Sequence, residues 1–166
     1  MSAAVVDAGP LIHLHEVGAL RHLAIFSTLH VPSEIWSETV GQQRVPERAM
    51  LDLGVRRESH FDDLAHFVET NNLGVLHPGE QECLYTCRSE AISILVTDDL
   101  AARDAAKRLA ITPVGSLGII VRAYRVGRLE LDEAENSIRL LQTTSSLFVI
   151  SAIIELALEQ VRRSKR

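Results

Sequence analysis

The stretch Ala3-Ala4-Val5-Val6-Asp7 is a short apolar run that ends in an aspartate, and a second stretch, Ile94-Leu95-Val96-Thr97-Asp98-Asp99, ends in two. Apolar runs of this length are typical of strands that are buried on both faces of a parallel sheet. Ligands of such sheets bind just beyond the carboxyl ends of the strands. If these two strands are neighbours, Asp7, Asp98 and Asp99 meet at one edge of the sheet.

Strand-like runs alternate with helical patterns along most of the chain. Further strands are predicted at 29–31 and 111–114, and helices from Ser33, from Glu80, over 100–109 and from Ser116 to about Gly127. This alternation predicts an α/β fold with three layers, α/β/α, in which helices cover a central parallel sheet. Residues 55–75 show only a weak helical spacing.

The length suits one domain, which we expect over residues 1–166, with residues 130–166 as a C-terminal helical extension. The last helix of this extension is predicted from Leu147 to Arg163. Its apolar residues around Phe148 either form an interface or complete the core.

The composition is that of a globular protein, with 46% hydrophobic and 23% charged residues. The net charge of −5 argues against tight, sequence-independent binding of nucleic acid, but a carboxylate metal site would itself contribute negative charge. We find neither an apolar run of membrane-spanning length nor a secretory signal, so a cytoplasmic location without membrane contact is expected. Cys83 and Cys87 are interpreted as small buried residues.

Acidic residues occur at four points of this pattern. Asp7 and Asp98-Asp99 follow strands, Glu38 lies on the helix after the second strand, and Glu80 opens a helix. Each has an ordinary explanation when taken alone, since Asp7 can cap a helix and glutamates usually face solvent. Taken together, clustered carboxylates repel one another and favour a hard cation such as Mg²⁺ or Mn²⁺. The joint pattern therefore indicates a metal site that hydrolyses an anionic substrate.

Five short segments, in this order and spacing, resemble the PIN-domain family, and in particular its small prokaryotic VapC-like members. The segments are Val5–Ile12, Val31–Glu38, Gly79–Glu82, Thr97–Arg103 and Val114–Gly118. The resemblance covers nearly the whole chain and agrees with the parallel sheet expected above.

The resemblance implies a metal-dependent endoribonuclease, in which Mg²⁺ or Mn²⁺ activates water for attack on an RNA phosphodiester. Carried over by position, Asp7, Glu38 and Glu80 match the first three acids of the family, and either Asp98 or Asp99 matches the last. It further implies an RNA substrate, a role as the toxin of a toxin–antitoxin pair with an antitoxin protein as partner, and a homodimer.

The chain departs from the family pattern at two positions. Gly9 stands where many relatives carry serine or threonine, and Glu80 stands where aspartate is usual. These departures leave open a second hypothesis, a non-catalytic PIN-like module that binds RNA or a protein. A phosphotransfer enzyme of the haloacid-dehalogenase type is disfavoured, since Gly9 occupies the place of its second aspartate.

Arg103 and Lys107 lie one turn apart on the helix that follows Asp99. At that place they could contact substrate phosphates beside the acids. An ordinary solvated helix face explains them equally well.

Overall fold

The computed structural model describes residues 2–164. Its centre is a five-stranded sheet with the order β3-β2-β1-β4-β5, in which every pair of neighbouring strands is parallel. The strands are β1 (Ala3–Val6), β2 (Thr28–Pro32), β3 (Arg56–Glu58), β4 (Ile94–Val96) and β5 (Thr112–Val114).

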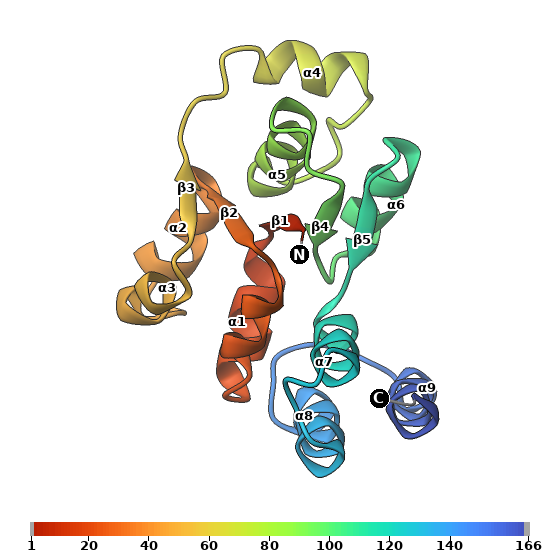
Figure 1. Ribbon diagram of the computed structural model, residues 1–166. Coiled ribbons are helices and arrows are strands. Elements are labelled where there is room, and N and C mark those ends of the chain that lie inside the picture. Colours follow the sequence, from red (N-terminus) through yellow and green to blue (C-terminus); the bar gives the residue numbers. More distant parts are fainter. Residues whose placement is uncertain (1, 165–166) are drawn as a thin grey trace.

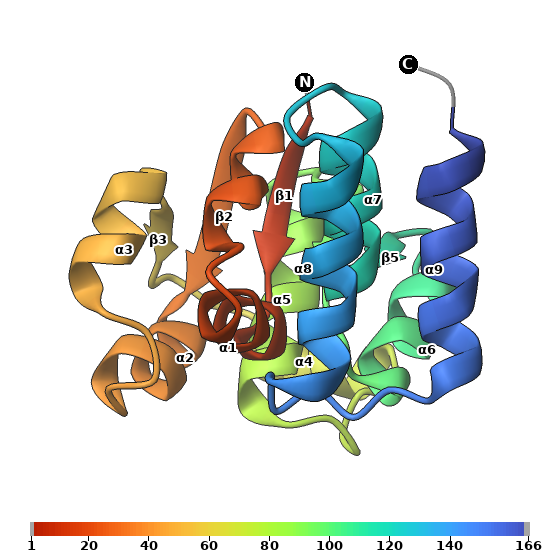
Figure 2. The same cartoon turned by 90° about the horizontal axis from the view of Figure 1, so that it is seen from below.

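Helices cover both faces of this sheet. They are α1 (Ala8–Glu16), the 3₁₀-helix η1 (Leu20–Ile25), α2 (Ser33–Trp36), the π-helix η2 (Ser37–Gly41), α3 (Glu47–Leu53), α4 (Leu64–Thr70), α5 (Pro78–Ser89), α6 (Leu100–Arg108), α7 (Ser116–Arg125), α8 (Leu131–Thr143) and α9 (Ser151–Arg163). Helices α4 and α5 lie on one side of the sheet, and α1, α7 and α8 lie on the other (Figures 1 and 2). The three-layer α/β/α fold predicted from the sequence is confirmed.

The pairing of β1 with β4 decides where the acids lie. Val5 is in register with Leu95, and Val6 with Val96. All four side chains are buried, as strands covered on both faces require. The pairing continues past the strand end, where the backbone N–H of Asp7 donates to Val96 O at 2.9 Å. The two strands that end in aspartate are therefore neighbours, as expected.

Strand β3 and helix α4 occupy the segment whose sequence pattern is weak. The sequence of β3 is Arg-Arg-Glu and has no apolar alternation, because the strand forms the edge of the sheet. Tertiary contacts hold it instead. His30 Nδ1 lies 2.7 Å from Glu58 Oε1, and the guanidinium of Arg57 lies 4.1 Å from the ring centroid of Trp36.

The last two helices, α8 and α9, pack on each other and on α7. Helix α9 begins at Ser151 and not at Leu147. Residues 147–150 are extended, since Leu147 and Val149 pack on the core while Phe148 and Ile150 face solvent. None of the helices within residues 2–164 is long and apolar enough to cross a membrane.

Candidate active site

Asp7 lies at the carboxyl end of β1 and caps helix α1. Its side chain is buried, with Oδ1 accepting from Ala8 N at 2.8 Å and Oδ2 accepting from Thr97 Oγ1 at 2.7 Å. Aspartate is a favoured N-cap, so the local sequence alone explains part of this geometry. The hydrogen bond from Thr97 adds a tie to the end of β4. Asp7 is thus fixed between the two central strands.

Glu38 lies where the short helix α2 widens into the π-helix η2. The hydroxyl of Thr39 donates to Ile35 O at 2.7 Å and supports this turn. Single π-turns interrupt regular helices frequently at functional sites. The turn directs both Glu34 and Glu38 to the same cavity beside Asp7.

Two residues of α5 hold α2 against the sheet edge. Glu82 is buried, and its Oε1 accepts from Ser33 Oγ at 3.0 Å and from Glu34 N at 3.3 Å, at the start of α2. Gly79 allows the close approach of the two helices. A Cβ atom at Gly79 would lie 2.7 Å from Ile35 Cδ1 and 2.9 Å from Glu38 Oε1. The absence of a side chain at Gly79 therefore leaves the space that the Glu38 carboxylate occupies.

Glu80 lies in the first turn of α5, where its Oε2 accepts from His77 N at 3.0 Å. The carboxylates of Asp7, Glu38 and Glu80 line one cavity of about 420 Å³. The three acids come from distant parts of the sequence and meet at the carboxyl edge of the sheet, as the sequence predicts.

The pKa values of the cavity carboxylates Asp7, Glu38 and Glu80 are all raised, so their neutral forms are favoured. Burial raises the pKa of Asp7, and the charges of Asp99 and Asp98 raise it further, against the lowering effect of the Thr97 hydrogen bond. Burial, and then the charge of Asp7, raise the pKa of Glu38. Burial raises the pKa of Glu80 to about 7, with Asp99 and Asp7 adding to the rise. Such a set is stabilised either by protons or by a cation.

Asp98 serves as a clamp between elements. Its Oδ1 accepts from Ser116 N at 2.7 Å, and its Oδ2 accepts from Ser116 Oγ at 2.6 Å and lies 2.7 Å from His13 Nδ1. A Cβ atom at Gly115 would lie 2.9 Å from Asp98 Oδ1, so the glycine permits this contact. Both carboxylate oxygens of Asp98 are therefore already engaged.

Asp99 has a different environment from Asp98. Its Oδ1 accepts from Ala102 N at 2.8 Å and caps helix α6. Its Oδ2 has no hydrogen-bond partner within residues 2–164. The charge of Asp99 acts on both Asp7 and Glu80. Of the two adjacent aspartates, Asp99 is thus the one with a free oxygen and with electrostatic contact to two cavity acids.

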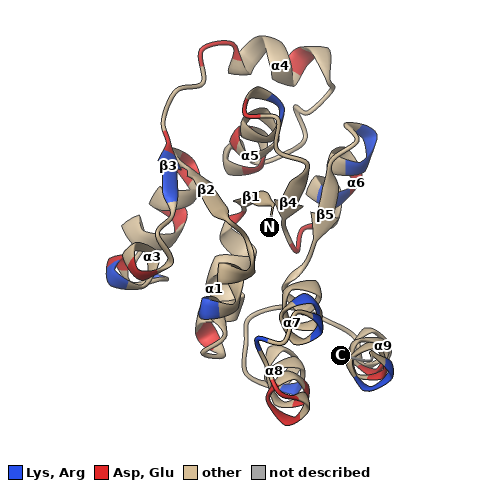
Figure 3. Cartoon of the chain, in the orientation of Figure 1, with Lys and Arg blue, Asp and Glu red and all other residues tan. Residues whose placement is uncertain are grey.

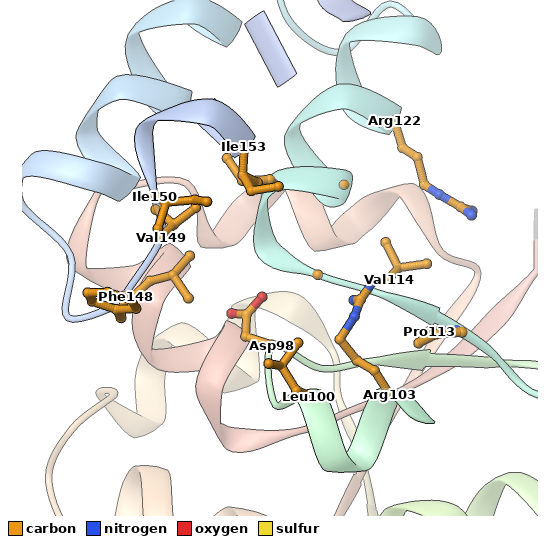
Figure 4. A pocket seen from close by; sticks show the side chains of 14 residues that line it. Asp98, Leu100, Arg103, Pro113, Val114, Arg122, Phe148, Val149, Ile150 and Ile153 are labelled. Carbon is orange, nitrogen blue, oxygen red and sulfur yellow. The ribbon is translucent and has the colours of Figure 1, made fainter. Parts of the chain in front are cut away.

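The two predicted phosphate contacts, Arg103 and Lys107, do not line this cavity. Arg103 Nη1 donates to Thr97 O at 3.2 Å, and its side chain lines a separate groove together with Asp98 (Figure 4). Lys107 is exposed one turn further along α6. The structure places Arg103 close to the acids and Lys107 on an open helix face.

Arg44 and His77 also line the acidic cavity, and sequence reasoning did not assign either of them to it. Arg44 follows η2 in a tight turn, in which its backbone N–H donates to Thr39 O at 2.8 Å. Within residues 2–164 its side chain forms no ion pair. The signal in the sequence is only that a basic residue follows Glu38 in a polar loop, which has no periodicity.

The chemical type of the side chains around the cavity suits a hard divalent cation. The candidate donors are carboxylate oxygens, the ligands that Mg²⁺ and Mn²⁺ prefer. Within residues 2–164, no three His, Cys, Asp or Glu side chains are close enough together to form a ready-made metal site.

Comparisons with known proteins agree with this geometry. A family model described as a PIN domain matches residues 3–163. No curated protein and no solved structure gives a significant match to the chain. PIN domains are typically nucleases that use divalent metals, and here Asp7, Glu38 and Glu80 meet at the carboxyl edge of the parallel sheet. The match spans nearly the entire sequence, and the chain belongs to the PIN-domain family.

Proposed function

We propose that the acidic cavity binds Mg²⁺ or Mn²⁺ and that the protein is a metal-dependent endoribonuclease. The observation that carries this proposal is the convergence of Asp7, Glu38 and Glu80 on one cavity, each with a raised pKa. A bound divalent ion lowers the pKa of water and offsets charge on a phosphodiester. Asp99 completes the ligand set through its free oxygen, and Asp98 positions Asp99 by clamping the end of β4.

The residues around the metal position have separate tasks in this proposal. Asp7 is held in place by hydrogen bonds from Ala8 and Thr97, one to each carboxylate oxygen, and the second lone pair of each oxygen would be the one that binds a cation. Glu38 is partly exposed at the cavity, and its raised pKa makes its carboxylate a better proton acceptor for the attacking water.

Arg44 is the cation that meets the substrate phosphate. It lines the cavity with the acids, and its side chain is free of ion pairs within the described residues. A guanidinium binds phosphate oxygens in a bidentate manner and remains charged at any physiological pH. Arg44 therefore draws the polyanion into a cavity that would otherwise repel it.

RNA is proposed as the substrate, together with a toxin role and an antitoxin partner, from the family resemblance. A cytoplasmic location is proposed from the sequence pattern alone. The alternative, a module that binds without cleaving, differs from a nuclease only in lacking cleavage activity. It would bind the metal or RNA but leave the phosphodiester intact.

Cleavage of a labelled single-stranded RNA, with Mn²⁺ or with a chelator, tests the proposal. The parent protein should cleave only with the metal, and Asp7→Asn should lose cleavage. Asp104→Asn, an exposed change on α6, is the matched control and should stay active. Cleavage that survives chelation would reject the metal mechanism. Stabilisation of the parent by Mn²⁺ without cleavage would support the non-catalytic alternative.

A further inference from the structure

A second concavity lies beside the turn that carries Thr97, Asp98 and Asp99, since Asp98 lines it. It is an open groove of about 570 Å³ between the start of α6, the β5–α7 connection and the segment that leads into α9. Phe148, Val149 and Ile150 lie along one side of it, and Arg103 and Val114 along the other, with the Asp98 carboxylate between them (Figure 4). The groove therefore reaches the residue next to Asp99.

The groove is basic although the chain is acidic. Arg103 and Arg122 line it. The one carboxylate in its wall, that of Asp98, accepts two hydrogen bonds from Ser116 and contacts His13. Residues 100–128 contain six Lys or Arg and one Asp or Glu, within a chain of net charge −5. Figure 3 shows Lys and Arg on both α6 and α7. Within the groove itself, two arginines face one carboxylate, and this balance favours an anionic ligand.

The groove also presents an aromatic ring to solvent. Phe148 is 90% exposed, whereas the six other aromatic side chains of the chain are buried or partly buried. Its neighbours in the groove are apolar and exposed as well, with Leu100 at 77% and Ile150 at 56%. Apolar side chains gathered in water mark a binding surface. A flat ring among cations is the arrangement on which nucleic-acid bases stack.

We propose that this groove binds the nucleotides of a single-stranded nucleic acid next to the bond that is cleaved. Phe148 stacks on a base, and Arg103 and Arg122 contact the flanking phosphates. The inference rests on the proposed nuclease function, because the nucleic-acid strand would run from the groove to the proposed metal site at Asp99. An apolar protein segment would use the aliphatic side chains but not the excess of positive charge. A base paired within a duplex is not free to stack on Phe148, so single strands are preferred.

Fluorescence anisotropy with a labelled single-stranded RNA tests this site. Binding is measured with chelator present, and RNA integrity is checked on a gel, so that the result does not depend on cleavage. Phe148→Ala should weaken binding by roughly 10-fold or more, and Phe148→Trp should retain it. Phe148→Leu should resemble Phe148→Ala, since it keeps the apolar character but not the aromatic face. Val75→Ala, a change at another exposed apolar side chain, should have no effect.

The salt dependence of binding tests the cations. Arg122→Ala should reduce the slope of log affinity against log salt concentration by about 1. Arg48→Ala, in an exposed arginine of α3, should leave that slope unchanged. A duplex of the same sequence should bind more weakly than the single strand and should not respond to Phe148→Ala.

Several outcomes would overturn the inference. An RNA affinity of Phe148→Ala equal to that of the parent would show that the ring does not contact RNA. Another such outcome is a parent dimer, seen by light scattering, that Phe148→Ala dissociates without changing RNA affinity per chain, because the groove would then be an interface between copies. Loss of RNA binding in Phe148→Ala, in a protein that never cleaves, would retain the groove and reject only the nuclease function.

Discussion

The turn Thr97–Asp99 contacts two regions of opposite chemistry: Thr97 donates to Asp7 of the acidic cavity, and Asp98 lines the groove. The cavity holds carboxylates from β1, η2 and α5, whose pKa values are raised. The groove is lined by apolar side chains and by two arginines. The comparison teaches that adjacent aspartates serve different regions. Asp99 acts on the cavity acids, while Asp98 clamps the wall of the groove.

The sharpest way to break this comparison is to change the two aspartates separately. Asp99→Asn should lower RNA cleavage by about 100-fold or more, because even groups that only support metal ligands contribute 10–100-fold. Its stability should hardly change, since asparagine is as good an N-cap as aspartate. Parallel assays of cleavage rate and thermal unfolding measure both effects.

Asp98→Asn should instead lower the free energy of unfolding by about 2 kcal/mol, because a charged acceptor of bonds from Ser116 is lost. Urea denaturation measures this loss. Equal losses of stability in Asp98→Asn and Asp99→Asn would contradict the division of roles.

A glycine substitution sharpens the comparison at the cavity. Gly79→Ala places a Cβ atom 2.9 Å from Glu38 Oε1 and 2.7 Å from Ile35 Cδ1. The expected cost is about 1–3 kcal/mol in unfolding free energy, although alanine normally favours a helix. Gly74→Ala is the control, since a Cβ atom there has no neighbour within 4 Å. Urea titrations of both variants measure the effect, and equal stability would show that the α2–α5 contact is not close-packed.

The pH dependence of the free energy of unfolding reports on the cavity, because Glu80 lies there and has a raised pKa. Glu80 has an unfolded pKa of 4.5 and a folded pKa of about 7. Below pH 4.5 the Glu80 carboxyl is protonated in both the folded and the unfolded protein, and its full contribution to the free energy of unfolding is present. As the pH rises towards 7, the unfolded state ionises first, so the metal-free protein loses stability, on the order of 2 kcal/mol. Urea midpoints at pH 5 and pH 8 in chelator should show this loss.

Glu80→Gln should flatten that dependence, and Glu69→Gln, an exposed change on α4, should not. Saturating Mn²⁺ should flatten it in the parent too, because a bound cation stabilises the ionised form. A parental slope in Glu80→Gln would assign the effect to another group.

The smallest expected effect concerns Gly9, where the family resemblance leads one to expect a serine or threonine. A Cβ atom there would lie 3.4 Å from His13 Cε1, an ordinary contact. Gly9→Ser should therefore raise the unfolding free energy by about 0.5 kcal/mol through helix propensity alone. A thermal shift measures it. A loss of stability would mean that the serine disturbs the pairing of His13 with Asp98.

The sequence predicts the central strands well, because strands that are buried on both faces of the sheet consist of continuous apolar residues. Strands β1 and β4 are continuous apolar runs, and their pairing brings Asp7 to the turn that holds Asp99. The edge strand β3 has no such pattern, since the hydrogen bond between Glu58 and His30 and the contact of Arg57 with Trp36 hold it in place.

The details of the site depend on tertiary placement. Asp98 and Asp99 are equivalent in the sequence, and only the position of Ser116 at the start of α7 separates them. Arg44 reaches the cavity from a polar turn without periodicity. The extended segment 147–150 reads as helix in the sequence because its apolar residues merge with those of α9. Interactions between distant segments decide all three points.

The convergence of separate acids on one cation is tested most directly by calorimetric titration of Mn²⁺. The parent should bind the ion with a saturable heat, and Asp7→Asn, Glu38→Gln, Glu80→Gln and Asp99→Asn should each weaken the same binding by about 10-fold or more. Asp104→Asn should bind as the parent does. Parental affinity in all four of these variants would contradict a shared metal site.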